Sequence, residues 1–515
     1  MKALARTAAL LPWLADRANP LLVRYVRQEL RNRTFLVVFN ILLLFAGVAS
    51  MLVATIAIGE QDAGADLLAV LCGVLGFALW VIQPMGVYMS MIRERDENTW
   101  DLLDLTGMRP GRLLRGYLLA GLVQGMLYFS AVAPFLVMAY LLKGIDLLSI
   151  LMALVLLAAG GIALSCFAVF LGTVQTNKSG RGGLNLILLL CVLGVWSLGW
   201  PLWLEGLEEV SRGLARGFAV EPWGVIAALG FMTNLWLAAV VVLLSLSAAQ
   251  LTFRADNRST MPRLVWMLVW CNGLAWCIGL IALADMRARE VTQMFAVYAV
   301  FGTVWGLLLA AFACTEDYPL SPRQARWIRE ARGWRKATAW FLGPGAARGT
   351  LAALLLLAAS LGVGAVAIFF RTDDDWSELM LSAWLMIAYG MTILVSVDRL
   401  CRGPFSGWIQ TPGMRRSALL PTIIALALIT SIPALAFEDS FGVLNAFNPL
   451  IAPVYLPDDG LAVGIDAFTA DVAIVLISFA GCFAIFAQLV FAFAHMTIKT
   501  TRVRADADID NPRES

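Results

Sequence analysis

Long apolar blocks alternate with short polar segments along the whole chain. Each block is about the twenty residues that a helix needs to cross roughly 30 Å of hydrocarbon. Because every backbone N–H and C=O must be satisfied inside the lipid, blocks of this length predict transmembrane helices. The pattern predicts twelve spans, at 35–58, 66–92, 116–142, 146–173, 184–204, 223–252, 264–285, 292–314, 350–370, 377–397, 418–437 and 469–496.

Composition agrees with this pattern. Hydrophobic residues make up 60% of the 515 residues and charged residues only 14%, which is far from the average of soluble domains. We therefore expect an all-α integral membrane protein, with about twelve transmembrane helices arranged as two six-helix halves, and not a soluble enzyme.

The basic residues are distributed unevenly between the two sides of the membrane. If the N-terminus is cytoplasmic, the inner segments hold 32 of the 38 Lys and Arg but only 16 of the 36 Asp and Glu. An excess of Lys and Arg in short loops marks the cytoplasmic side, so both termini are predicted to be cytoplasmic. The net charge of +2 gives no indication of a nucleic-acid partner. The lipid bilayer, with its anionic inner surface, is the expected neighbour of the Arg-rich segments.

The spans predict a division of the chain into five parts. Residues 1–34 form a cytoplasmic N-terminus whose segment 19–31 has the pattern of an amphipathic helix at the membrane interface, or is a plain basic tether. A six-span half follows at 35–254, a linker at 255–263, a second half at 264–498 and a disordered tail at 499–515. Both halves are predicted to begin and end on the cytoplasmic side. The loop 93–115, after the second span of the first half, would therefore correspond to the loop 315–349, after the second span of the second half.

Signatures of catalysis or metal binding are missing from the sequence. It contains no phosphate-binding GxxxxGK[ST] motif, no HExxH motif and a single histidine, His495. The eight cysteines form no CxxC pair, so neither a disulfide nor a zinc site is expected. No charged residue lies well inside a predicted span, which disfavours proton coupling. We predict no catalytic residue, no metal ligand and no cofactor bound by this chain, and no substrate-binding residue can be identified.

Two kinds of residue in the spans predict helix packing. The pairs Gly121/Gly125 and Gly302/Gly306 have the GxxxG spacing that lets helices approach closely. Uncharged polar side chains could line a pathway, but hydrogen bonding between helices is the commoner use. These residues are Asn40, Gln83, Gln124, Asn185, Asn234, Asn272 and Gln488.

The most informative stretch is the loop 93–116, between the second and third spans. Asn98 or Thr99 can cap a short helix that carries Asp101 in its first turn and ends at Gly107. Trp100, Leu102 and Leu103 would form an apolar patch on it. An exposed apolar patch with flanking charges is typical of a docking surface. The alternative is a rigid turn packed on the membrane surface.

This loop resembles the corresponding loop in permease subunits of exporter-type (type-2) ABC transporters. The family pattern is Glu-Arg-x-x-Gly-Thr-Leu-Glu-x-Leu, then Thr-Pro, a basic residue and Gly-Lys. The chain departs from it at Asn98, Trp100, Gly107 and Tyr117, which replaces the lysine. The resemblance in topology covers residues 19–254. The matching residues are Glu94-Arg95, Thr99, Asp101, Leu103, Thr106, Arg109 or Arg112, and Gly116.

The resemblance implies a transmembrane permease in a bacterial inner (plasma) membrane, whose loop seats in a separate ABC ATPase subunit that binds the ATP. The second half would be a fused second permease or six accessory spans, and a homodimer or a second permease subunit is also compatible. Rival hypotheses are a secondary carrier that works without ATP and a membrane scaffold or enzyme. The coupling residues that the resemblance implies are Glu94, Arg95, Thr99, Trp100, Asp101 and Leu103.

Overall fold

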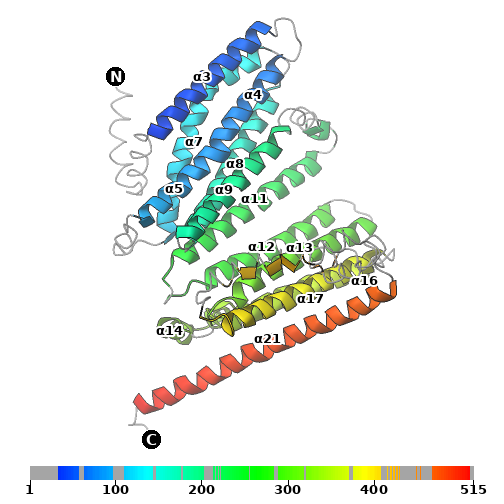
Figure 1. The fold of residues 1–515 in the computed structure, drawn as a ribbon. Helices are drawn as coiled ribbons and strands as arrows, with labels where there is room; N and C mark the ends of the chain where they lie inside the picture. The colour runs from blue at the N-terminus through cyan, green and yellow to red at the C-terminus, as the bar shows by residue number, and fades with distance from the viewer. Residues whose placement is uncertain are drawn as a thin grey trace. The chain divides into compact units, whose positions relative to one another are not determined.

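The computed structural model of the chain is built from helices (Figure 1), and no β-strand occurs among the residues it describes. The chain divides into two compact units, Met1–Thr252 (unit 1) and Phe253–Ser515 (unit 2). The described residues are 33–56, 63–96, 110–142, 146–174, 178–201, 213–214, 216–218, 220, 222–253, 256–283, 288–317, 320–369, 375–407, 415, 418–419, 422–423, 425–426, 429, 448, 453 and 467–510.

The described part of unit 1 contains six long apolar helical segments, called rods below. The second rod is continuous but changes its winding, because a π-helical turn, η1, joins two α-helices. Pro84 is the second residue after this turn; it has no N–H to donate to the carbonyl four residues earlier, and a wider turn accommodates that defect. The elements are α3 (Arg33–Ile56), α4 (Ala63–Phe77), η1 (Ala78–Ile82), α5 (Gln83–Asp96), α7 (Pro110–Leu141), α8 (Leu147–Thr173), α9 (Lys178–Pro201) and α11 (Pro222–Leu251).

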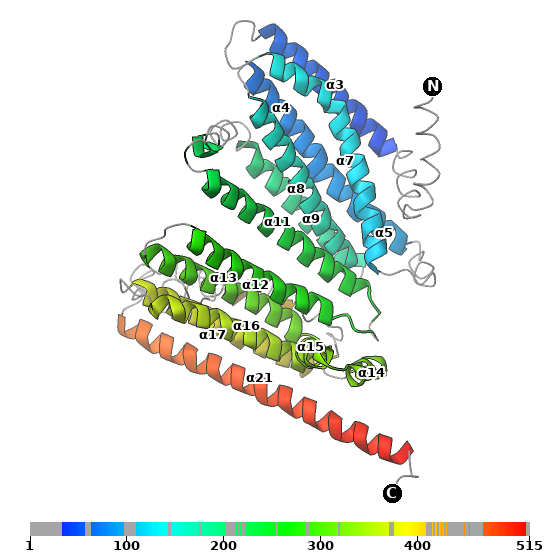
Figure 2. The same cartoon turned by 180° about the vertical axis from the view of Figure 1, so that it is seen from behind.

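The described part of unit 2 contains five long helices and two short ones. The short helices, α14 and α15, lie between the second and third long helices of the unit, at the end of the unit where α12 begins (Figure 2). The elements are α12 (Thr260–Leu283), α13 (Ala288–Cys314), α14 (Pro322–Glu330), α15 (Trp334–Leu342), α16 (Ala346–Phe369), α17 (Asp375–Arg402) and α21 (Ala467–Asp510).

Eleven helices in the described part of the chain are long and apolar enough to cross a membrane. Each coincides with one of the predicted spans. The remaining predicted span, 418–437, falls mostly outside the described residues. Many large apolar side chains, such as Leu44, Val155 and Phe479, are exposed on the long helices. Such surfaces suit lipid rather than water, so the fold is that of an all-α membrane protein.

The structure corrects two boundaries of the sequence-based assignment. Helix α7 begins at Pro110, six residues before the predicted span, because proline is well tolerated in the first turn of a helix. Helix α21 continues to Asp510, beyond residue 496, where the last predicted span ends.

Both GxxxG pairs lie where helices approach closely, as predicted. A Cβ atom on Gly121 would come within 2.7 Å of Val87 in the second rod, and one on Gly125 within 3.1 Å of Leu79. In unit 2, added Cβ atoms on the other pair would lie 2.7 Å from the Trp270 indole nitrogen and 2.6 Å from Leu357. Since real Cβ atoms do not approach other atoms this closely, alanine does not fit without local rearrangement.

The two units share one pattern of helix neighbours. If the helices are numbered as the predicted spans of each unit, so that 418–437 counts as the fifth span of unit 2 and α21 as the sixth, the same pairs pack against each other in both: 1–2, 1–3, 2–3, 2–4, 3–4, 3–6 and 4–6. In unit 1 these pairs are α3/α4, α3/α7, α4/α7, α5/α8, α7/α8, α7/α11 and α8/α11. In unit 2 they are α12/α13, α12/α16, α13/α16, α13/α17, α16/α17, α16/α21 and α17/α21. Unit 2 therefore repeats the helix arrangement of unit 1 over the spans described in both.

Candidate functional site

The loop for which the sequence predicts a coupling role starts from a buried acidic side chain. Glu94 lies in the last turn of α5 and is only 6% exposed. The hydroxyl of Tyr117, on the next span, donates a hydrogen bond to its Oε2 atom. Tyr117 itself is buried, in a cluster with Val87, Met91 and Leu113. The two ends of the loop are thus joined by a polar contact set in an apolar surround, where such a bond is strong.

Of the predicted coupling residues, the structure locates Glu94 and the backbone of Arg95, both in α5. Thr99, Trp100, Asp101 and Leu103 fall in the segment 97–109, outside the described residues. The predicted helix start at Asn98 or Thr99 falls there too. Tyr117 stands where the family pattern has lysine, and its contact with Glu94 gives that departure a structural role.

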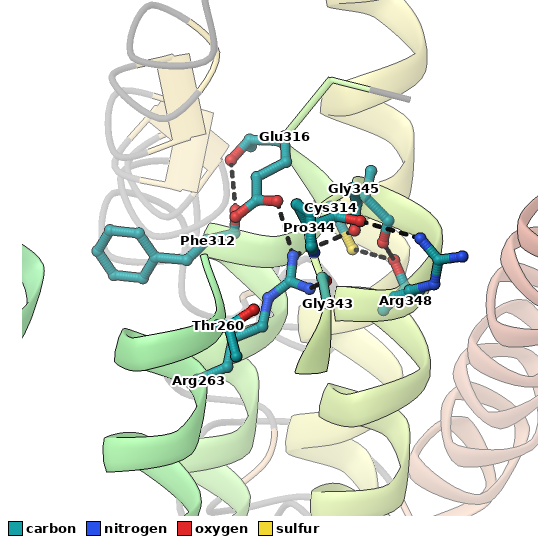
Figure 3. Close-up of polar contacts among 12 residues, drawn as sticks. Thr260, Arg263, Phe312, Cys314, Glu316, Gly343, Pro344, Gly345 and Arg348 are labelled. Carbon is teal, nitrogen blue, oxygen red and sulfur yellow. Dashed lines mark hydrogen bonds and ion pairs between the residues drawn. The ribbon is translucent and has the colours of Figure 1, made fainter. Parts of the chain in front are cut away.

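The corresponding loop of unit 2, residues 315–345, is organised around Arg263 (Figure 3). This side chain reaches from the first turn of α12 and is only 3% exposed. Its Nη2 atom pairs with Glu316 Oε2 at 2.7 Å and donates to the Gly345 carbonyl at 3.1 Å, while Nη1 donates to the Gly343 carbonyl. One guanidinium therefore ties the start of the loop to its end.

Two glycines make room for this arginine. A Cβ atom on Gly349 would overlap the Arg263 guanidinium and lie 2.7 Å from the Cβ of Ala313. Gly345 has a φ of +107°, a conformation that side chains with a Cβ rarely adopt. The sharp turn that ends the loop and the close approach of arginine to the next helix thus both depend on glycine.

Arg402 holds the start of the same loop from the end of α17. Its Nε atom donates to both carboxylate oxygens of Asp398, at 2.8 Å each. Its Nη2 atom donates to the carbonyls of Cys314 at 2.8 Å and Glu316 at 2.6 Å. These carbonyls lie at the C-terminal end of α13, where backbone acceptors lack helical partners and the helix dipole favours a cation.

A third arginine completes the arrangement. Arg415 donates from Nη1 to the Thr315 carbonyl at 3.3 Å and to the Asp317 carboxylate at 3.1 Å. Three arginines from separate segments therefore converge on residues 314–317. The sequence pointed to the loop 315–349 but not to these partners, because each arginine is distant in the chain. The turn 343–345, with two glycines beside a proline, was the available signal.

The uncharged polar residues of the spans mostly bond to other helices or to their own. Gln83 donates to the Ser165 hydroxyl at 3.2 Å, between the second and fourth spans, and Gln488 accepts from Arg399 at 3.4 Å. Gln124 bonds to Tyr128 and Asn40 to the Leu36 carbonyl within one helix. The Oδ1 atom of Asn185 is buried without a partner in the described part of the chain. The interpretation as helix-packing groups holds for Gln83 and Gln488.

Metal-binding groups are scarce. Among the described residues, no three or more His, Cys, Asp or Glu side chains come close enough to hold an ion. All eight cysteines are free. His495 lies in α21, with a side chain outside the described set.

Comparison with family models, with curated proteins and with solved structures gives no match to this chain.

Proposed function

We propose that this chain is the transmembrane permease subunit of an ATP-driven exporter of the ABC type. In this proposal a separate ATPase subunit binds ATP on the cytoplasmic side of a bacterial inner membrane. The loop after the second span docks on it through Arg95, Thr99, Trp100, Asp101 and Leu103, and the sixth predicted coupling residue, the buried Glu94, anchors the base of the loop. The membrane-spanning helices rearrange when that partner binds and hydrolyses ATP.

The contact between Glu94 and Tyr117 is the observation that supports this proposal best. It joins the base of the motif-bearing loop to α5 and α7 inside the packed bundle. Helix α5 also packs against α8, and α7 against α3 and α11. In this proposal, a displacement of the loop by the docked subunit moves α5 and α7, and these helices move the spans that pack against them. Coupling between a docked subunit and the bundle requires such a connection.

The distribution of charge supports an external energy source. In the described spans, charged side chains lie near helix ends, as Glu94, Arg263 and Asp398 do, and the middle turns are uncharged. Carriers driven by ion gradients generally need ionisable groups within the membrane. A partner ATPase supplies the energy without such groups.

Affinity purification of the tagged full chain from its native membrane tests the proposal. Mass spectrometry of the eluate should find an ATPase subunit in stoichiometric amount, and the eluate should hydrolyse ATP. Trp100→Ala and Asp101→Ala should each lower the amount of co-purified ATPase at least tenfold, because the apolar anchor or its flanking charge is lost.

Two control variants lie at the predicted outer side of unit 1. Trp223 is 79% exposed at the start of α11, and Asp146 is exposed before α8 without a side-chain capping bond. Trp223→Ala and Asp146→Ala should leave co-purification unchanged. A chain that purifies alone and without ATPase activity would contradict the proposal and favour a secondary carrier or a scaffold.

A further inference from the structure

The short helices of unit 2 form a basic surface next to the ends of two spans. Helix α13 ends at Cys314, eight residues before α14 begins, and only residues 343–345 separate α15 from α16. Three extended residues span at most about 10 Å. Because α15 also packs against α12 and α16, both short helices are held close to the membrane surface.

Helix α14 is fixed to the unit by one side. Ser321 and Gln324 form a capping box, with the Gln324 N–H bonded to the serine hydroxyl at 3.2 Å and the Ser321 N–H to the glutamine side chain at 3.1 Å. The Gln324 amide also donates to the Asp256 carbonyl at 3.0 Å. Ala325 and Ile328 are partly buried with Gln324. The remaining positions of the helix face away from the unit.

The outward side of α14 is strongly basic. Arg323, Arg326, Arg329 and, after the helix, Arg332 are all exposed. Arg323 pairs with Asp256, but the other three have no acidic partner within the described part of the chain. Glu330 is the single acid in α14. Three guanidinium groups without an acidic partner among the described residues therefore lie on or next to α14.

Exposed aromatic rings accompany these arginines. Trp327 lies on the outward side of α14, and Trp340 and Phe341 are exposed on α15, in edge-to-face contact with centroids 4.8 Å apart. Indole and phenyl rings beside basic residues are typical of helices that lie in the headgroup region. Exposure of Trp327 and Trp340 would be unfavourable on a surface that faced only water.

We propose that α14 and α15 form a binding surface for anionic phospholipid headgroups of the cytoplasmic leaflet. Arg326, Arg329 and Arg332 contact the phosphates, because guanidinium groups bind phosphate oxygens in a bidentate manner. Trp327, Trp340 and Phe341 lie at the boundary between headgroups and acyl chains. The predicted cytoplasmic position of this loop brings it to the leaflet that carries anionic lipid. This proposal is independent of whether an ATPase docks on unit 1.

Native mass spectrometry of the detergent-solubilised full chain tests the proposal. The probes are dioleoyl phosphatidylglycerol and dioleoyl phosphatidylcholine, which share their acyl chains. The native chain should bind phosphatidylglycerol more tightly. The triple variant Arg326→Gln/Arg329→Gln/Arg332→Gln should weaken that binding at least roughly tenfold, since each basic residue near an anionic surface contributes about fivefold.

Two further variants make the result specific. Arg326→Lys/Arg329→Lys/Arg332→Lys keeps the charge and should retain the preference for phosphatidylglycerol even if the glutamine variant is unstable. Glu330→Gln on the same helix should not weaken binding. Equal binding of the two lipids by the native chain, or unchanged phosphatidylglycerol affinity in the folded glutamine variant, would overturn the proposal. Loss of a co-purifying protein with lipid binding intact would assign the surface to a protein partner instead, and would overturn it too.

Discussion

The two units hold the loop after their second span in different ways. In unit 1 the loop begins at Glu94, whose carboxylate accepts a hydrogen bond from Tyr117 on the following span. In unit 2 the corresponding acidic residue is Glu316, which pairs with Arg263 from the first span of the unit. Two more arginines then bond to residues 314–317.

One arrangement of helices thus supports two kinds of loop base, meaning the contacts that hold the start of the loop after the second span: Glu94 with Tyr117 in unit 1, and Glu316 with Arg263 in unit 2. The same pairs of spans pack in both units, so the framework alone does not dictate how the loop is held. In unit 1 an uncharged donor bonds to the acidic residue, and the proposed docking motif lies in the loop itself. In unit 2 buried ion pairs fix two short helices against the bundle. The difference fits one loop that transmits movement and another that forms a rigid surface.

Breaking the arginine centre of unit 2 should have the largest effect. Arg263→Met removes the partner of Glu316 and the Arg263 donor to the buried Gly343 carbonyl, whereas the Gly345 carbonyl still accepts from the Gly349 N–H. Removing one partner of a buried ion pair costs about 3–5 kcal/mol. We expect a loss of this size in the free energy of unfolding, measured by SDS titration in mixed micelles. A loss below about 1 kcal/mol would show that the guanidinium does not hold the loop.

Tyr117→Phe makes the matching change in unit 1. It removes one hydrogen-bond donor from the buried Glu94 carboxylate and keeps the packing of the ring. A hydrogen bond to a charged group contributes about 1.5–3 kcal/mol. The same SDS titration should show a loss in that range, smaller than for Arg263→Met. An equal or larger loss would contradict the contrast between the two loop bases.

Gly349→Ala tests the close approach of Arg263 to α16. The added Cβ would overlap the guanidinium, so we expect a loss of roughly 1–3 kcal/mol from local displacement. Gly362→Ala in the same helix is the control, since nothing lies within 4 Å of its Cβ position. That change should be neutral or stabilise by up to about 1 kcal/mol through helix propensity. Similar results for both variants would contradict the described fit.

The exposed ion pair on α14 should give the smallest effect. Arg323 and Asp256 lie 3.4 Å apart, and their side chains are 72% and 40% exposed. Solvent-exposed pairs contribute about 0–1 kcal/mol. Arg323→Ala should therefore change the free energy of unfolding by less than 1 kcal/mol, which sets the scale for the buried pairs. A larger loss would mean that this arginine also anchors the helix.

The sequence predicted the long helices well because the apolar blocks match the thickness of a bilayer. It also predicted the close approach at Gly121/Gly125, since small residues four apart leave room for a neighbour. Helix ends were less certain: α7 starts at Pro110 inside a segment assigned to the loop. The residues around these helix ends are polar, so hydropathy does not indicate where the helix begins or ends.

The loop bases could be predicted only in part. Glu94 was identified through the motif, and the loop that contains Glu316 through its correspondence to the loop of the first half. Their partners Tyr117 and Arg263 were not, because a contact between residues 23 or 53 positions apart leaves no local pattern. Such pairs cannot be recognised in a single sequence and are found only in the folded structure. The repeated order of helix neighbours was equally hidden, since the two halves share topology without evident sequence similarity.

Photo-crosslinking from the loop of unit 1 tests the proposed function most directly. A benzophenone amino acid in place of Trp100, in the full chain within native membranes, would be irradiated and the products identified by mass spectrometry. We predict one main covalent product with a nucleotide-binding ATPase subunit, and none from the same probe in place of Trp223 at the opposite end of the unit. Crosslinks from Trp100 to lipid alone would contradict the account and make this loop a turn on the membrane surface.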